Sequence, residues 1–485
     1  MSSTRRSFSI LLLSGNFIAL AQFLTSLIMA RLLTPYDYGV FSVTAVLVGI
    51  LQIFREMGAN SFLIQSKLLN DQQIRAALGV TCLMSWSIAG LLMMSRTWIS
   101  DYYHESGVAE VVGILSLNFL VVPFGSNTLA LLRREMRFTL VARIDIAANI
   151  VGLSTSLALA AQGFGYVSLA WGASAIVITS SLMSIPCRAA GLPRWPSFRG
   201  VGEIFRFGLP LVGTGLASTA YMGLFELIIS RTLGMQSAAM FSRAIGVPRL
   251  LSNLILPSVG NLAFPFFSRQ HRERNDPKPY YLNGVSYLTG IMWPLFAMAG
   301  YLGEPLVITL YGKQWLDAIP MIGWLCAANA IGVSFALFPA YINAIGEQRI
   351  NFRISCWSLL LRAGFILYLQ GFGLTYVAMG VVVENILMAM TYLVFLRRKL
   401  RVSVFDYLQA IASSVLLTTL VLASVVGVSY IRMPVSPWDP VPNLVMQAGM
   451  AAIAWLGSIF ILGHPLRREL LLFMNKAASK ARAGN

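Results

Sequence analysis

Charged residues are scarce in this chain. Asp, Glu, Lys and Arg make up 11% of its 485 residues, whereas soluble globular domains carry about 25%. Hydrophobic residues make up 57%, and the mean hydropathy is +0.71. Because so few charges cannot cover the surface of a soluble globule of this length, the composition predicts an all-α polytopic membrane protein.

Residues that commonly carry chemistry are also few. The three histidines lie on separate predicted loops, which argues against a shared metal site or a catalytic triad. No glycine-rich loop precedes a Lys-Ser/Thr pair, so a P-loop nucleotide site is excluded. The four cysteines lie in or beside apolar stretches and show no paired spacing. We therefore predict a protein that is not an enzyme and that holds no metal and no cofactor.

Long apolar stretches dominate what remains. About fourteen of them are long enough to cross a hydrocarbon layer of about 30 Å as helices. They cover residues 8–30, 39–54, 77–95, 108–131, 139–161, 165–186, 207–230, 244–267, 284–303, 319–345, 352–369, 374–396, 405–431 and 443–463.

The connections between these spans are alternately rich and poor in Lys and Arg. Most of the 36 basic residues fall on one side if both termini are cytoplasmic, which follows the positive-inside rule. The excess that gives a net charge of +17 thus lies in short loops beside spans, where it meets anionic membrane lipid. We therefore predict no nucleic-acid partner. Six basic residues are left on the opposite side: Arg31, Arg96, Arg231, Arg243, Lys313 and Arg432.

An internal repeat divides the chain. Gln162-Gly163-Phe164-Gly165 recurs as Gln370-Gly371-Phe372-Gly373, and Arg31 and Arg231 each close a span, with Phe-Ser about ten residues further on. The repeat predicts two six-helix lobes, residues 1–196 and 197–402, followed by two accessory helices and a basic cytoplasmic tail in 403–485. Because six is even, both lobes enter the membrane in the same orientation, as in parallel-repeat transporters.

Ionisable residues inside the spans are the candidate functional groups. Arg362 and Glu384 each lie about ten residues from a span end, near mid-membrane, where a charge needs a partner or water. They either line a pathway or form an ion pair that locks two helices together. Glu226 and Asp145 are further acidic groups in spans and, with Glu384, are candidates for ion coupling.

Arginines also flank the predicted pathway. Arg31, Arg231 and Arg243 lie at its outer mouth and Arg55 at its inner mouth. Because arginine binds phosphate with two parallel hydrogen bonds, this distribution suits an anionic cargo. The alternative is that the residues at the mouths merely extend their charged ends to the interface. That alternative does not apply to Arg362, which lies too deep.

Four sequence patterns resemble a known family. The chain is similar to the polysaccharide transporter family of the multidrug/oligosaccharidyl-lipid/polysaccharide (MOP) flippase superfamily, which includes Wzx-like lipid-linked oligosaccharide flippases. The resemblance covers about residues 1–400. It rests on Arg31-Leu32-Leu33-Thr34-Pro35 with Gly39-Val40-Phe41-Ser42, on Glu56-Met57-Gly58-Ala59, on Leu132-Arg133-Arg134-Glu135-Met136-Arg137-Phe138 and on Leu310-Tyr311-Gly312-Lys313-Gln314-Trp315.

The resemblance implies two six-helix lobes around a central cavity that opens alternately to each side. It also implies a cargo of undecaprenyl-diphosphate-linked oligosaccharide (an exopolysaccharide, O-antigen or capsule repeat unit), moved to the periplasmic leaflet of a bacterial inner membrane. Membrane lipids and other polysaccharide assembly proteins, such as a polymerase, would be its partners.

Two other functions stay open at this point. A membrane-embedded polysaccharide polymerase or glycosyltransferase would carry a large outer loop, and the longest predicted outer loops here are short. A cation-coupled drug exporter of the same superfamily would carry an acidic residue in its first span, which has none.

Overall fold

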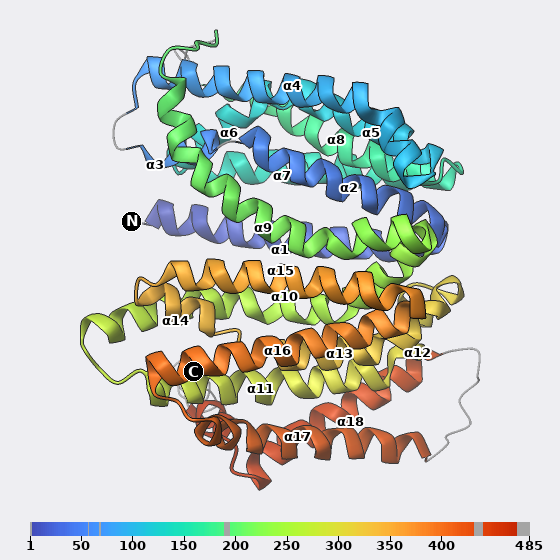
Figure 1. Cartoon of the computed structure of the whole chain (residues 1–485), viewed down its shortest axis with the longest axis vertical. Coiled ribbons are helices and arrows are strands. Elements are labelled where there is room, and N and C mark those ends of the chain that lie inside the picture. The colour runs from blue at the N-terminus through green and yellow to red at the C-terminus, as the bar shows by residue number, and fades with distance from the viewer. Residues whose placement is uncertain (1, 57, 67–68, 189–194, 431–439, 473–485) are drawn as a thin grey trace, which may run out of the picture. The chain divides into compact units, whose positions relative to one another are not determined.

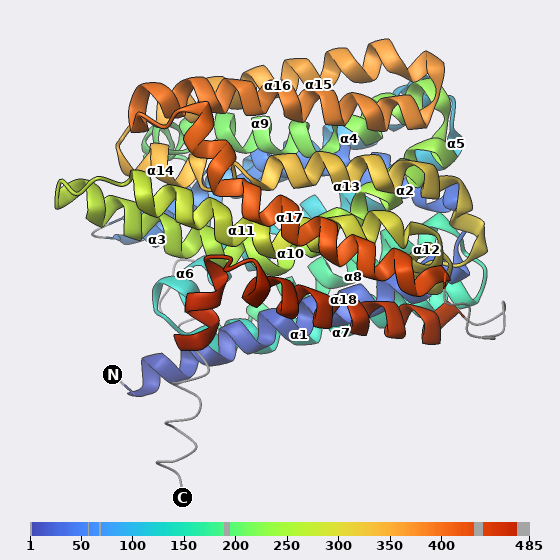
Figure 2. The same ribbon diagram turned by 90° about the horizontal axis from the view of Figure 1, so that it is seen from below.

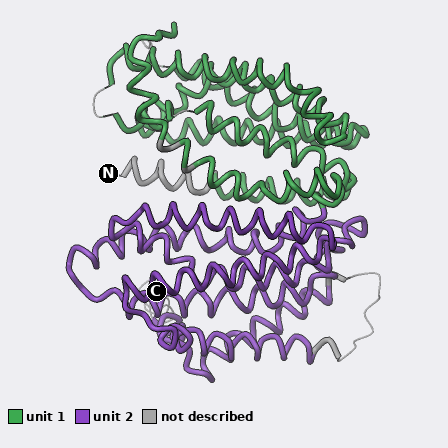
Figure 3. The backbone as a smooth tube through the Cα atoms, viewed as in Figure 1, with its two compact units in different colours: residues 1–239 green, residues 240–485 purple. Residues whose placement is uncertain are grey.

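The computed structural model describes residues 2–56, 58–66, 69–188, 195–430 and 440–472. Within these ranges every regular element is helical. The chain divides into two compact units, residues 1–239 and 240–485 (Figure 3). Arg432 and residues 473–485, which include the end of the predicted basic tail, lie outside the described residues.

The first unit is built from long helices with two short ones between them. A capping box starts α4, because the Asn70 side chain accepts from the Gln73 N–H while the Gln73 side chain accepts from the Asn70 N–H. The helices, labelled in Figure 1, are α1 (Ser2–Leu32), α2 (Pro35–Glu56), α3 (Ala59–Gln65), α4 (Asp71–Tyr103), α5 (Ser106–Val121), α6 (Pro123–Arg134), α7 (Phe138–Ala161), α8 (Tyr166–Ser184) and α9 (Val201–Leu233).

Small residues bring helices of the first unit close together. α7 packs against α8, and there Gly152 and Gly172 face each other together with Ser156. A Cβ atom on Gly152 would lie 2.2 Å from Ile176 Cγ1 and 2.8 Å from the Gly172 carbonyl oxygen. Helices in membranes associate through such close backbone approaches, because apolar burial alone gains little in lipid.

The second unit is likewise built from long helices with short ones between them. Its helices are α10 (Met235–Arg272), which begins at the end of the first unit, α11 (Lys278–Tyr301), α12 (Gly303–Leu310), α13 (Ile319–Val333), α14 (Phe338–Ala344), α15 (Gln348–Leu369), α16 (Leu374–Leu400), α17 (Val404–Tyr430) and α18 (Pro440–Ile461), with short 3₁₀ helices η1 (Lys313–Ala318) and η2 (Gln370–Phe372). α15 and α16 run side by side (Figures 1 and 2).

The two accessory helices are tied to the second unit through α11. The Trp455 Nε1–H of α18 donates to the Gly290 carbonyl at 2.8 Å, and Thr289 Oγ1 donates to Ser414 Oγ of α17 at 2.8 Å. In an apolar surrounding these hydrogen bonds replace those that water would make. α17 and α18 therefore form one packed body with α11.

The helices confirm the prediction of an all-α polytopic membrane protein. Each of the fourteen predicted spans coincides with a helix or with successive helices. By length and hydropathy, 11 helices of the described chain could cross a membrane, or up to 13 if each of two bent pairs counts as one span. One bent pair is α5 and α6, which meet at 56° where Pro123 begins α6.

The division into compact units and the predicted repeat place the boundary between the two halves of the chain at different residues. The division falls after residue 239, because α9 packs against α2 and α4. The repeat places the end of its first copy at residue 196. In both copies the Gln-Gly-Phe-Gly segment joins two adjacent helices that pack together, α7 to α8 and α15 to α16. The predicted domain boundaries stay a prediction about the repeat.

Candidate functional site

The structure brings Arg362 and Glu384 into direct contact. Arg362 Nε lies 2.9 Å from Glu384 Oε2, and the two side chains are 8% and 1% exposed. Glu384 follows the start of α16 by ten residues, about 15 Å along the helix axis. A buried guanidinium and carboxylate thus neutralise each other near the middle of two candidate spans.

The hairpin of α15 and α16 positions this pair. Ser358, Arg362 and Ile366 recur every four residues on the buried face of α15. Gly380 lets α16 approach closely, since a Cβ atom there would lie 2.6 Å from Leu369 Cδ1. Gly373 has φ 109°, a conformation open to glycine, and it separates η2 from α16. Both helices therefore meet in a fixed register.

Aromatic rings hold two of the predicted mouth arginines. Arg243 Cζ lies 5.2 Å from the ring centre of Tyr311 and 5.1 Å from that of Trp315. Arg231 Cζ lies 5.2 Å from the ring centre of Tyr102. A cation over an aromatic face is attracted by about 0.5–2 kcal/mol. These ring partners were not predicted as site residues, although Tyr311 and Trp315 stand four residues apart in a segment singled out from the sequence.

The other two predicted arginines of the mouths lie in the last turns of their helices. Arg31 lies exposed in the last turn of α1. Arg55, in the last turn of α2, is buried, and its Nη2 lies 3.0 Å from Glu56 Oε1. The positive charge of each favours the negative end of its helix dipole. Arg55 is therefore a charge held inside the first unit.

The predicted acidic residues lie on separate helices. Glu226 is buried on α9, where the Ser230 hydroxyl donates to its backbone carbonyl. Asp145 lies half-buried on α7. Its carbonyl accepts from Asn149 Nδ2 at 2.8 Å, and Asn149 Oδ1 accepts from Gln22 Nε2 of α1 at the same distance. Asp145 thus lies beside a polar link between α1 and α7.

In the described part of the chain, no three His, Cys, Asp or Glu side chains lie close enough together to hold a metal ion. The arrangement instead offers cations at helix ends and one neutralised pair at depth. Such groups can bind and release an anion, and they can exchange partners without breaking a covalent bond.

Comparison with known proteins gives the chain its relatives. A family model described as "Polysaccharide biosynthesis protein" matches residues 28–320. The chain is 25% identical over 349 residues to the succinoglycan biosynthesis transport protein ExoT of Rhizobium meliloti (strain 1021), covering 70% of this chain and 68% of that protein. It is 24% identical over 315 residues to the teichuronic acid biosynthesis protein TuaB of Bacillus subtilis (strain 168), covering 64% and 65%.

Among solved structures, the lipid II flippase MurJ in an inward closed conformation has a similar fold. The TM-score is 0.75 at 12% sequence identity, and the match covers 95% of this chain and 99% of that one. At this identity the likeness concerns the fold alone.

Proposed function

Because the chain belongs to the polysaccharide biosynthesis protein family, we propose that it is a flippase for undecaprenyl-diphosphate-linked oligosaccharide. The cargo would be a repeat unit of an exopolysaccharide, O-antigen or capsule, moved from the cytoplasmic to the periplasmic leaflet of a bacterial inner membrane. ExoT, to which the chain is 25% identical over 349 residues, is named a transport protein, which supports transport over catalysis.

The buried pair of Arg362 and Glu384 is the observation that carries this proposal. A diphosphate presents oxygens that match the guanidinium as well as a carboxylate does. In our proposal the diphosphate competes with Glu384 for Arg362, and its departure lets the pair close again. The exchange keeps the guanidinium partnered at every stage, which avoids the cost of an isolated charge in the membrane.

The remaining arginines would act before and after that exchange. We assign Arg55 to the inner approach and Arg31, Arg231 and Arg243 to the outer one. The rings around Arg231 and Arg243 fix where their charges lie, so these two side chains would guide the anion without following it. Alternating access of the two predicted repeats would expose the approaches in turn.

Energy would come from an ion gradient or the membrane potential, because the sequence carries no P-loop. Glu384 is our first candidate for a proton carrier, since release from Arg362 would change the stability of its charge. Glu226 and Asp145 are the other candidates. Both termini would lie in the cytoplasm, and a polymerase would receive the cargo outside.

A leaflet assay tests the proposal. In cells depleted of this protein, lipid-linked oligosaccharide is labelled from each side of the inner membrane, and Arg362→Ala and Glu384→Ala are compared with wild type. The matched control is the ion pair of Arg269 and Glu273, whose Nε and Oε1 atoms lie 2.7 Å apart but whose side chains are 69% and 43% exposed. Replacing both with alanine should leave transport intact.

We expect full-length cargo to accumulate on the cytoplasmic side in depleted cells and in both variants of the buried pair. Cargo that reaches the periplasmic face but stays unpolymerised would instead identify a membrane polymerase or glycosyltransferase.

A further inference from the structure

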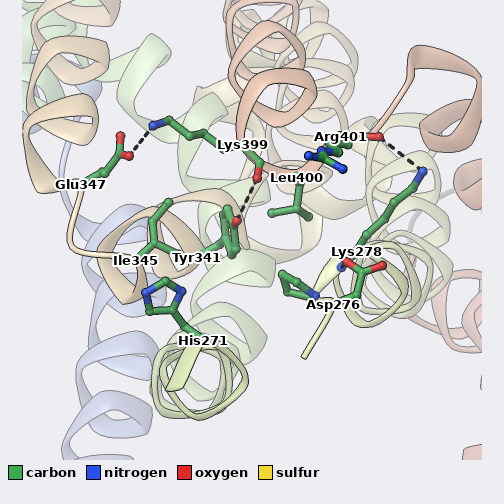
Figure 4. Close-up of a pocket in the computed structure, with 10 residues that line it drawn as sticks. His271, Asp276, Lys278, Tyr341, Ile345, Glu347, Lys399, Leu400 and Arg401 are labelled. Carbon is green, nitrogen blue, oxygen red and sulfur yellow. Dashed lines mark hydrogen bonds and ion pairs between the residues drawn. The ribbon is translucent and has the colours of Figure 1, made fainter. Parts of the chain in front are cut away.

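A pocket of about 630 Å³ opens at one end of the second unit, where α10 and α16 end and α11 begins (Figure 4). Tyr341 and Leu400 are buried at its base. His271, Lys399 and Arg401 are exposed around it. The pocket thus combines an apolar floor with a cationic rim, and none of its lining residues belongs to the proposed transport pathway.

Basic residues outnumber acidic ones around this opening. Two chain segments frame it, residues 269–278 and 397–401, and together they hold eight Lys and Arg but two acidic residues. The acidic neighbours already have partners within the protein. Lys399 pairs with Glu347, Lys278 Nζ lies 2.7 Å from Asp406 Oδ2, and Arg269 pairs with Glu273. Of the charged residues that line the pocket itself, three are basic (Lys278, Lys399 and Arg401) and two are acidic (Asp276 and Glu347). The larger excess of positive charge lies beside the pocket, on Arg272, Arg274, Arg397 and Arg398.

Hydrogen bonds to the backbone fix the position of this rim. Lys278 Nζ donates to the Arg401 carbonyl and the Tyr341 hydroxyl donates to the Lys399 carbonyl, each at 3.4 Å (Figure 4). Arg401 has φ 53°, so the chain turns away from α16 at this residue. The end of α16 is held against α11 and α14, and Lys399 and Arg401 stay beside the pocket.

The membrane brings a ligand of matching chemistry to this place. α10 and α16 are candidate spans by length and hydropathy, and both are longer than the hydrocarbon layer, so in a membrane their basic ends would lie at the level of the head groups or beyond it. Basic pockets between membrane helices on the cytoplasmic side bind the phosphates of anionic lipid head groups. We propose that this pocket binds the phosphodiester head group of an anionic phospholipid, with Lys399 and Arg401 around the phosphate and Tyr341 and Leu400 beneath the glycerol.

Native mass spectrometry of the purified full-length protein tests this site, using phosphatidylglycerol and, for comparison, phosphatidylcholine. The pocket variant carries Lys399→Gln and Arg401→Gln. The matched control carries Arg397→Gln and Arg398→Gln, which remove the same charge from the same segment at exposed residues that do not line the pocket. Arg401→Gln alone preserves the pairing of Lys399 with Glu347 and guards against a loss of folding.

We expect wild type to retain phosphatidylglycerol in preference to phosphatidylcholine. The double pocket variant should bind phosphatidylglycerol about 10- to 30-fold more weakly, Arg401→Gln about fivefold, and the control within about threefold of wild type.

Three results would overturn the proposal: equal retention of the two lipids by wild type, equal losses in the pocket variant and the control, or displacement of phosphatidylglycerol by millimolar inorganic phosphate. Tighter binding of undecaprenyl diphosphate than of phosphatidylglycerol would overturn the assigned source, because the pocket would then receive cargo. Loss of selective phosphatidylglycerol binding in this assay would leave the transport proposal untouched, because the assay measures no movement of cargo between leaflets.

Discussion

Arg362 and Glu384 stabilise each other only while both are present. A charge left alone in an apolar interior has lost its hydration and gains no partner, so removing one member of such a pair costs more than removing both. The contact at 2.9 Å between two nearly unexposed side chains makes this hairpin the place where that difference should be largest.

We expect Arg362→Met and Glu384→Leu each to lower the free energy of unfolding by about 3–5 kcal/mol. The double variant should lose much less than the sum, because it buries no unpaired charge and keeps a similar volume. Thermal unfolding in detergent of the four proteins of this cycle measures the coupling. Additive losses would show that the two groups do not depend on each other.

The sequence offered this contact as one of two alternatives, because the two residues lie on adjacent spans joined by a short glycine turn. It did not predict the ring partners of Arg243. Tyr311 and Trp315 follow it at a long distance along the chain, and no local periodicity relates them to it. Only the tertiary fold brings Arg243 of α10 to this segment, so a residue predicted as a cation at the outer mouth lies over two aromatic rings.

At the scale of elements, close helix pairs depend on particular glycines. We expect Gly152→Ala to destabilise the protein by about 1–3 kcal/mol, because the new methyl group would meet the Gly172 carbonyl as well as Ile176. The backbone of α8 would have to move away. Melting temperature in detergent measures the loss.

Gly90→Ala is the matched control for that substitution. Gly90 is exposed on α4 with open space around it, so alanine should instead add about 1 kcal/mol through its higher helix propensity. A similar effect at both glycines would mean that helix propensity, and not contact between α7 and α8, decides the outcome.

We expect the docking of the accessory helices to depend on pH through His464 in the turn after α18. His464 is 1% exposed; its Nδ1 accepts from the Leu466 N–H at 3.2 Å, so its Nε2 carries the hydrogen toward Ser414 Oγ at 3.1 Å. Burial lowers the pKa of His464 below its usual value of 6.5. Protonation would place a hydrogen on Nδ1, facing the N–H of Leu466.

We therefore expect stability to be full above pH 6.5 and to fall as the pH drops from there toward the lowered pKa, by at most about 1.4 kcal/mol per pH unit. The unfolded chain takes up the proton first, which sets this sign. Unfolding measured between pH 5 and 8 should show the slope in wild type and not in His464→Gln, whereas His104→Asn, at an exposed residue, should retain it. A slope that persists in His464→Gln would assign it to another group.

The elements themselves could be predicted well from apolar length, and each predicted span is a helix or successive helices. The role of His464 could not be predicted from the sequence. It lies in a loop, and its partner Ser414 belongs to a helix that no sequence period relates to it. Polar contacts between helices depend on rotation about each helix axis, which hydropathy does not determine.

At the scale of the whole molecule, the family resemblance is confirmed by the match over residues 28–320 and the fold by the likeness to MurJ. The predicted sidedness rests on a different kind of evidence, the distribution of Lys and Arg. In the second unit, the segments 269–278 and 397–401 lie at the ends of candidate spans and hold four Lys and Arg each, whereas the segment around Gly312 carries a single lysine. The positive-inside rule assigns the cytoplasmic side from this difference in the number of Lys and Arg.

Reporter fusions test that sidedness directly. Green fluorescent protein fused after Asn275 or after Asn485 should fluoresce, because both points are predicted to be cytoplasmic, and alkaline phosphatase should be active after Gly312. The reverse pattern would mean that the whole protein has the opposite orientation in the membrane, because every span would change direction together. It would also move the pocket at the end of α16 to the outer leaflet and place Arg55 outside, so one orientation experiment bears on both proposals.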